Sequence, residues 1–181
     1  MLLTHPLPGG AALRLLEESD ARELYALIEA NRDHLARWMP WAAAQTLEDT
    51  REFIRITRRQ LADNDGIQTA IVRGGRIVGA VGFHSVEWRN QATGIGYWLA
   101  RDEQGLGTMT AAVRALLDHA FGPWGLNRVE IRAAPENARS RAIPERLGFR
   151  QEGKLREVER VGDRFLDNVV YSMLAAERLP Q

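Results

Sequence analysis

Two glycines stand one residue apart at the start of a helical pattern, in the stretch QGLGTMT at residues 104–110. The apolar run GYWLA at residues 96–100 precedes them, so the order is strand, glycine-containing turn and helix. The first N–H groups of a helix lack intrahelical acceptors and lie at the positive end of its dipole. Glycines let an anion reach those groups, so a phosphate site is one interpretation and an ordinary turn is the other. Neither the P-loop GxxxxGK nor the dinucleotide fingerprint GxGxxG is present.

Cysteine and histidine usage excludes several other kinds of site. The chain has no cysteine, which excludes disulfides, thiolate nucleophiles and cysteine metal sites. Its four histidines have no metal-like spacing, and we expect no metal. His84 stands in a run typical of a central strand, and a role in a pocket stays open for it because imidazole exchanges protons near neutral pH.

The elements that must position these residues follow the order βααβββαβαββ, read from hydrophobic periodicity and turn residues. Asp20 is predicted to cap the first helix, and Thr46–Asp49 resembles a capping box at the start of the second. Gly74-Gly75 and Gly162-Asp163 predict hairpin turns. The pattern gives a mixed α+β fold with a mainly antiparallel seven-stranded sheet and about four helices. The β-α-β unit over residues 96–134 should place two strands parallel.

Length and charge limit the class of protein further. The 181 residues suit a single domain over residues 1–181. The 24 basic and 24 acidic residues cancel and the pI is about 6.9, which argues against nucleic acid as a direct partner. No run of 18 apolar residues predicts a membrane span, and the first residues do not read as a secretory signal. We therefore expect a cytoplasmic protein.

Three motifs in the same order resemble the GCN5-related N-acetyltransferases, and within them the RimJ/RimL-like group that acetylates protein N-termini. QGLGTM is similar to the Q/R-x-x-G-x-G/A pyrophosphate loop of that family, GYWL to the strand before it, and ENARSRAIPERLGF at residues 136–149 to its N-x-x-S…GF element. RWMPW and REVERVGDRFLDNVVYSML also resemble the substrate-side helix and last hairpin. The sixth position of the loop motif, usually Gly or Ala, is Met109, whose side chain must point away from a phosphate.

The resemblance implies acetyl-CoA as co-substrate, lying between two splayed parallel strands. Backbone groups of Tyr97 and Leu99 would pair with the pantetheine, and the amides of the loop would hold the pyrophosphate. Asn137 would hydrogen-bond the pantetheine arm, and Arg139 and Arg141 are further candidates for the CoA phosphates. The full set implied for acetyl-CoA is Tyr97, Trp98, Leu99, Gln104, Gly105, Gly107, Thr108, Met109, Thr110, Asn137 and Ser140.

The same resemblance implies two catalytic side chains. Ser140 would face the thioester sulfur and donate a hydrogen bond or proton to the leaving thiolate, although a cap on its own helix turn would also explain it. Glu159 stands nineteen residues after Ser140, the spacing of the serine and the proposed base in RimL-type enzymes. Its alternative is a solvated charge in REVERVGDR, with another group or water as base. The N–H of Leu99 is the candidate oxyanion donor.

The acceptor is the part of the site that the sequence describes least. An α-amine, with a pKa of about 7.7–8, is partly neutral at cytoplasmic pH, whereas lysine is near 10.4, so one carboxylate suits an α-amine better. Trp38, Trp41 and His84 are the candidate acceptor-binding residues, with ordinary core tryptophans as the alternative. We expect transfer to a protein N-terminus, such as that of a ribosomal protein. The alternatives are a small or toxic amino-acid-like amine and a non-catalytic acyl-CoA sensor, and a homodimer stays open.

Overall fold

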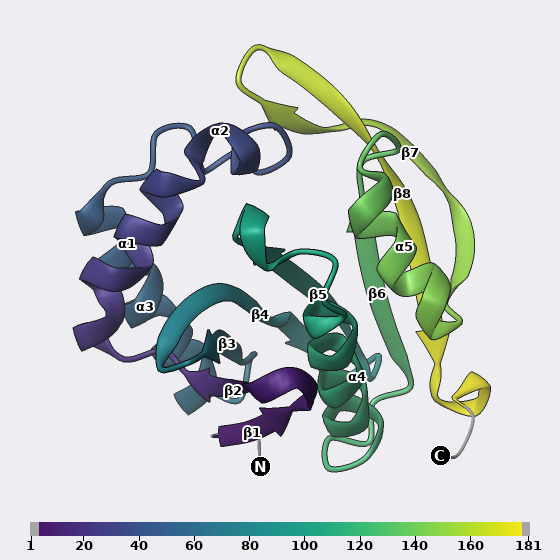
Figure 1. Ribbon diagram of the computed structural model, residues 1–181. Helices are drawn as coiled ribbons and strands as arrows, with labels where there is room; N and C mark the ends of the chain where they lie inside the picture. The colour runs from purple at the N-terminus through teal and green to yellow at the C-terminus, as the bar shows by residue number, and fades with distance from the viewer. Residues whose placement is uncertain (1–3, 179–181) are drawn as a thin grey trace.

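An eight-stranded sheet organises the chain, whose computed structural model describes residues 4–178 (Figure 1). The strand order is β1-β2-β3-β4-β5-β6-β8-β7, and every neighbouring pair is antiparallel except β5 and β6. The strands are β1 Thr4–Leu7, β2 Ala11–Leu15, β3 Gln68–Arg73, β4 Arg76–Glu87, β5 Ala92–Leu99, β6 Arg128–Ala133, β7 Arg150–Val161 and β8 Arg164–Leu174. The α+β class and its parallel pair are confirmed, with one strand more than predicted.

The additional strand is β1, at the edge of the sheet. It pairs with β2 around the short 3₁₀ turn Pro8–Gly10. Its sequence THPL contains Pro6, and proline within a strand-like run argues against a strand unless the strand lies at an edge. A run of four residues with one proline is therefore too short and too irregular to predict a strand from sequence.

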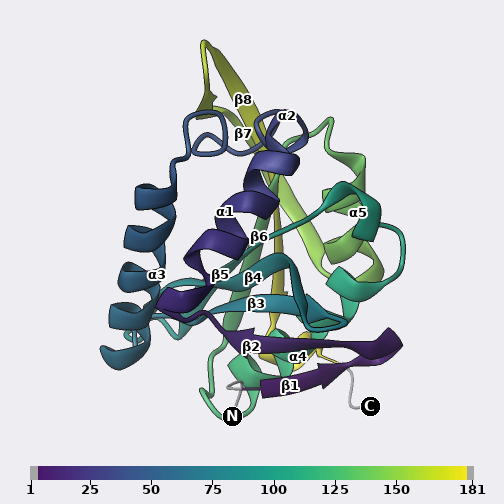
Figure 2. The same ribbon diagram turned by 60° about the vertical axis from the view of Figure 1, so that its left-hand side comes forward.

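The helices cover both faces of the sheet (Figure 2). They are α1 Ala21–Ala30, α2 Arg32–Leu35, α3 Leu47–Ala62, α4 Thr108–Phe121 and α5 Ala138–Leu147. A smaller core lies under α1 and α3, and a larger core lies under α4 and α5. Among the residues that the structure describes, no helix is both long enough and apolar enough to cross a membrane.

The two predicted helix starts have different outcomes. The capping box is confirmed, because the Thr46 hydroxyl accepts from the Asp49 N–H at 3.1 Å and the Asp49 carboxylate accepts from the Thr46 N–H at 2.9 Å. Asp20 is the N-cap residue of α1, as predicted, but its carboxylate accepts from no N–H group of that helix. Instead it accepts from the Glu17 N–H at 2.8 Å and from the Arg14 guanidinium at 2.6 Å, because a nearby arginine offers a charge-assisted bond.

The parallel strands β5 and β6 separate along their length. Their ladder joins only Ala92–Gly94 to Arg128–Glu130. The N–H of Ala100 donates to the Val78 carbonyl of the neighbouring strand β4. Successive peptide groups on a strand point to opposite sides. The N–H groups of Tyr97 and Leu99 therefore point toward the gap between β5 and β6.

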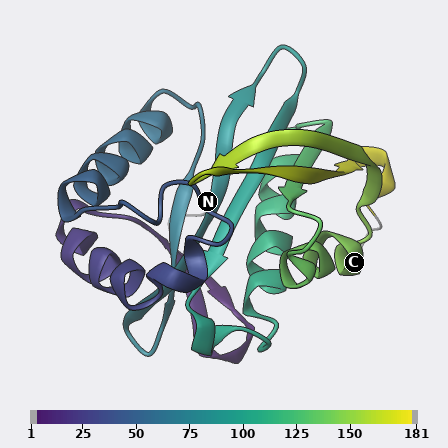
Figure 3. The same cartoon turned by 90° about the horizontal axis from the view of Figure 1, so that it is seen from above.

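The long hairpin of β7 and β8 extends across the end of the molecule toward the segment between α2 and α3 (Figure 3). Its turn at Gly162-Asp163 confirms the prediction, as does the Gly74-Gly75 turn between β3 and β4. A register shift interrupts the β7–β8 ladder between Leu155 and Glu159, where Glu157 has φ 49°. The strict alternation that the sequence suggests for this strand is therefore broken.

Candidate active site

Two cavities meet where β5 and β6 separate. The first, which we call the loop cavity, has a volume of about 1520 Å³ and is lined by Gln104–Thr110 and the start of α5. The second, the hairpin cavity, has a volume of about 1020 Å³ and is lined by Trp41, His84 and Glu159. Six residues line both: Trp38, Met39, Tyr97, Trp98, Asn137 and Ser140. A ligand in one cavity therefore adjoins a ligand in the other.

The glycine loop has the conformation of an anion site. Gly105 and Gly107 have φ of 81° and 77°, a region that side chains disfavour, and Gly107 directly precedes α4. The first intrahelical bond runs from Ala111 N–H to Gly107 C=O, so the three N–H groups before it have no acceptor within the helix. Met109 is only 6% exposed and packs in the core, as its departure from the motif requires. Bare N–H groups thus lie along the loop cavity.

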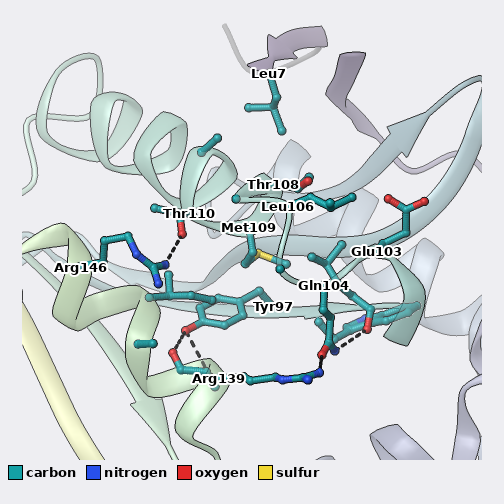
Figure 4. A pocket seen from close by; sticks show the side chains of 18 of the residues that line it. Leu7, Tyr97, Glu103, Gln104, Leu106, Thr108, Met109, Thr110, Arg139 and Arg146 are labelled. Carbon is teal, nitrogen blue, oxygen red and sulfur yellow. Dashed lines mark hydrogen bonds between the residues drawn. The ribbon is translucent and has the colours of Figure 1, made fainter. Parts of the chain in front are cut away.

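Gln104 connects three elements at the loop cavity. Its side-chain oxygen accepts from Arg139 of α5 at 2.6 Å, and its nitrogen lies 2.7 Å from the His34 Nε2 of α2 and 3.4 Å from the Leu99 carbonyl (Figure 4). A donating amide requires a neutral acceptor nitrogen on His34. Burial, followed by the charges of nearby arginines, lowers the pKa of His34 and favours that neutral form.

Arginines from α5 supply positive charge to the loop cavity. Arg139 and Arg146 both line it, and Arg146 donates to the Thr110 hydroxyl at 3.0 Å (Figure 4). Arg141 lines neither cavity; it donates to the Tyr171 hydroxyl at 2.8 Å and to the Pro135 carbonyl at 3.1 Å. Its candidacy for a phosphate is therefore wrong, because successive helix residues project about 100° apart.

Ser140 lies at the junction of the cavities. The Asn137 side chain accepts from the Ser140 N–H at 3.2 Å and so caps α5, while its NH₂ group has no acceptor among residues 4–178. The Ser140 hydroxyl is 3.3 Å from the Tyr97 hydroxyl, which itself donates to the Ser140 carbonyl at 3.0 Å. Burial raises the pKa of Tyr97 far above its usual range, so the phenol stays protonated. The Ser140 hydroxyl in turn donates to the Tyr97 oxygen.

Glu159 faces the hairpin cavity from β7. Its carboxylate is 3.5 Å from the Asn168 side-chain nitrogen, a long contact that leaves it accessible. Glu157, two residues earlier on the same strand, would share its face in a regular strand, but it lines neither cavity, because the bulge breaks the alternation and its N–H donates to Asp167 at 2.9 Å. Only one of the two carboxylates can therefore act in the hairpin cavity.

Aromatic residues form another wall of the hairpin cavity. The ring centroids of Trp41 and Trp98 lie 6.2 Å apart. Trp41 is 37% exposed, and Phe53 and Ile56 of α3, which line the same cavity, are 36% and 45% exposed. Residues 36–44 form turns and not the helix that the resemblance suggested, because Pro40 lacks an N–H and restricts its neighbour. Trp38 and Trp41 thus belong to a loop beside the cavity, whereas Trp98 belongs to β5.

His84 lies across two glycines of β5. A Cβ placed on Gly96 would be 2.8 Å from the His84 Cε1 and Nε2, and one on Gly94 would be 3.2 Å from its Cδ2. Solvent reaches the ring through the hairpin cavity, yet protein surrounds most of it. This burial, followed by the charge of Arg132, lowers the pKa of His84, so the ring is neutral at neutral pH. The glycines of TGIGYW therefore make room for an imidazole on the face of β5.

The two cavities differ in charge. Five arginines and three carboxylates line the loop cavity, whereas five carboxylates and two arginines line the hairpin cavity. A charged lining raises the local concentration of ligands of opposite sign. The loop cavity suits an anionic ligand and the hairpin cavity suits a cationic one.

The structure brings the predicted residues together. All eleven residues implied for acetyl-CoA line the loop cavity, and Trp38, Trp41, His84 and Glu159 line the hairpin cavity. The sequence interpretation missed the Tyr97 hydroxyl, His34 and Arg146. Only Arg146 had a usable signal, because it stands seven residues after Arg139 and therefore on the same helix face.

Comparison with known proteins agrees with this geometry. Residues 11–150 match the family model described as "Acetyltransferase (GNAT) domain". The chain is 42% identical, over 91% of each chain, to Bacillus subtilis (strain 168) YdaF, provisionally named a ribosomal N-acetyltransferase. Two solved structures resemble it. Mycobacterium smegmatis RimJ in complex with CoA-disulfide is 29% identical with a TM-score of 0.89, and the match covers 98% of this chain and 88% of that one. The microcin C7 self-immunity acetyltransferase MccE in complex with acetyl-CoA and AMP is 28% identical with a TM-score of 0.85, and the match covers 92% of this chain and 93% of that one. The chain therefore belongs to the GNAT acetyltransferase family.

Proposed function

We propose that this protein transfers an acetyl group from acetyl-CoA directly to the α-amine of a protein N-terminus, such as that of a ribosomal protein. The observation that carries the proposal is the junction of an arginine-lined cavity with a carboxylate-lined cavity at Ser140, Tyr97 and Asn137. Two substrates of opposite charge can bind at once, with their reacting ends adjacent. The likeness to YdaF supports a ribosomal acceptor, and such an acceptor would place the enzyme in the cytoplasm.

The loop cavity would bind the CoA part of the donor. The free N–H groups at residues 105–110, the dipole of α4 and the side chains of Arg139 and Arg146 would hold its phosphates. The N–H group of Tyr97 and the carbonyl group of Leu99 would pair with the extended pantetheine arm as an additional strand, as in strand addition to an open sheet edge. The free NH₂ group of Asn137 would reach the same arm.

The reaction needs a neutral amine, a stabilised oxyanion and a leaving thiolate. The amine nitrogen attacks the thioester carbonyl carbon, and the carbon–sulfur bond breaks. The Leu99 N–H would stabilise the charge that develops on the carbonyl oxygen. The Ser140 hydroxyl, which donates to Tyr97 in this structure, would turn to donate to the thiolate instead, a modest task because a thiol has an ordinary pKa of about 8.5.

Glu159 would take the proton from the acceptor ammonium, directly or through a water molecule. Its accessible carboxylate faces the hairpin cavity and Asn168 orients it. The acceptor would lie between this strand and the aromatic wall of Trp38 and Trp41, with His84 at the floor. An α-amine with a pKa of about 7.7–8 needs little help from this base, which favours an N-terminus over a lysine side chain.

The proposal is tested by mixing purified protein with acetyl-CoA and following free thiol. The acceptor panel contains N-terminal peptides of ribosomal proteins, the same peptides with a blocked α-amine, and small amines that include aminoacyl nucleotides, since MccE was solved with AMP. We expect turnover only on free N-termini. Turnover restricted to small amines would overturn the acceptor, and CoA binding without any turnover would indicate a sensor.

Matched variants test the catalytic roles. Ser140→Ala and Glu159→Gln should lower kcat while CoA affinity is kept. Glu157→Gln is the control, because Glu157 lies two residues away on the same strand but lines neither cavity. An unchanged rate and pH profile for Glu159→Gln would remove Glu159 as the base.

A further inference from the structure

Arg73 lies behind the glycine loop and contacts both of its ends. It is the last residue of β3 and lines neither cavity. One of its terminal nitrogens donates to the Thr108 hydroxyl at 2.5 Å, and its Nε lies 3.3 Å from a carboxylate oxygen of Glu103. Glu103 immediately precedes the stretch Gln104–Gly107 and Thr108 immediately follows it. A single guanidinium therefore joins the two ends of the loop.

These contacts are secluded from solvent. Thr108 is 2% exposed, and the Arg73 Nε and the paired Glu103 oxygen are both buried, with no hydrogen bond of good geometry to any residue in 4–178. In Figure 4 the Thr108 hydroxyl and the Glu103 carboxylate both point away from Tyr97. The Thr108 hydroxyl is thus committed to Arg73, and only its backbone N–H is left for a ligand.

We propose that Arg73 is a positioning residue for the pyrophosphate part of acetyl-CoA, acting through Glu103 and Thr108. The inference rests on the proposed function. Gly105 and Gly107 give the loop a large conformational freedom that must be lost when its N–H groups converge on an anion. Fixing both ends beforehand lowers that cost on binding.

Arg73 also has an electrostatic role. Glu103 places a half-buried carboxylate, with one oxygen fully buried, beside a site for phosphates, and its charge would oppose an anionic ligand. The guanidinium of Arg73 compensates that charge. Without Arg73, the buried oxygen of this carboxylate would lose its partner and the charge would repel the ligand. The effect of losing Arg73 should therefore depend on whether Glu103 is charged.

The test compares the affinities of CoA and of pantetheine, which lacks the pyrophosphate, by calorimetry. Arg73→Met should raise the Kd of CoA on the order of tenfold and leave that of pantetheine within about twofold, because only CoA contacts the loop. The KM for acetyl-CoA should rise in parallel while kcat at saturation is kept. Arg76→Met, an exposed arginine on the same hairpin, is the matched control and should change nothing.

Two further variants separate positioning from folding. Glu103→Gln combined with Arg73→Met should recover part of the CoA affinity, since it removes the repelling charge. Thr108→Val removes one contact without removing the guanidinium and keeps the test valid if Arg73→Met does not fold. Equal losses for CoA and pantetheine, or an unchanged Kd for CoA in both Arg73→Met and Thr108→Val, would overturn the role of Arg73. Wild-type protein that does not bind CoA would instead overturn the proposed function.

Discussion

The Tyr97 hydroxyl donates to the Ser140 carbonyl at 3.0 Å and lies 3.3 Å from the Ser140 hydroxyl, so one phenol engages both the backbone and the side chain of the same residue. Because its proton is used on the carbonyl, its oxygen can only accept from the serine. Tyr97 therefore ties Ser140 to β5 through two hydrogen bonds, and the one to the carbonyl can remain when the serine hydroxyl turns to another acceptor.

Replacing Tyr97 by Phe should lower kcat by about three- to tenfold, the effect of losing one orienting hydrogen bond. The phenyl ring would keep the packing, so the Kd of CoA should stay near the wild-type value. Stopped-flow measurement of thiol release gives the rate and calorimetry gives the affinity. Ser140→Ala is the comparison: if it impairs turnover while Tyr97→Phe does not, Tyr97 does not orient the serine.

Adding a methyl group at Gly96 should affect the acceptor and not the donor. Its Cβ would be 2.8 Å from the His84 ring and would displace the imidazole within the hairpin cavity. Gly96→Ala should raise the acceptor KM by about tenfold, in line with the cost of overpacking. Gly94→Ala, with a nearest approach of 3.2 Å, is the milder control. The double variant Gly96→Ala/His84→Ala should relieve the clash; a KM that stays high there would contradict this mechanism.

Arg32 should be needed for the shape of the aromatic wall. Its guanidinium donates to the carbonyls of Ala42, Ala43 and Gln45 at 2.5, 3.0 and 2.8 Å, within the loop that presents Trp41. Arg32→Met should raise the acceptor KM several-fold, with no change in the Kd of CoA. Glu29→Gln is the control, because Glu29 pairs with Arg32 at the exposed surface, where ion pairs contribute little. Equal effects of the two variants would show that the ion pair, and not the carbonyl contacts, matters.

His34 should make stability depend on pH. Burial and nearby arginines lower its pKa in the folded protein, so the unfolded chain binds a proton at a higher pH than the folded one. The free energy of unfolding should then fall as pH decreases from about 6.5 through the folded pKa; the loss should be absent above about pH 6.5 and complete below the folded pKa. His84 and His119, whose pKa values burial also lowers, act in the same direction.

The contribution of His34 to the pH dependence of stability is obtained from urea unfolding of wild type and His34→Gln at pH 7 and pH 5. Glutamine can still accept from Gln104 but does not titrate, so its loss of stability between the two pH values should be smaller than that of the wild type. An identical loss in both proteins would mean that the Gln104 contact does not depend on a neutral His34.

Most of the fold could be predicted because its signals are local. Gly74-Gly75, the capping box at Thr46 and the spacing of α4 each depend on a few neighbouring residues. β1 could not be predicted, since a four-residue edge strand with a proline is stabilised by its pairing with β2. The bulge at Glu157 likewise depends on the partner strand β8.

The site divides in the same way. The loop amides could be predicted because glycines and a helix start are adjacent in the sequence. The contacts of Tyr97 with Ser140, of Gln104 with His34 and of Arg73 with Thr108 join residues 43, 70 and 35 positions apart. No periodicity or motif in the sequence indicates contacts between residues so far apart along the chain. They arise only when β3, β5, α2 and α5 are assembled around the gap.

The junction of the two cavities has a practical consequence for inhibition. The donor and the acceptor would lie in separate cavities and touch only at Ser140 and its neighbours. A single molecule that joins the sulfur of CoA to the α-nitrogen of a peptide through an acetyl bridge could span both cavities. Such a bisubstrate compound would combine the two binding energies, and its peptide half would report which N-termini the enzyme prefers.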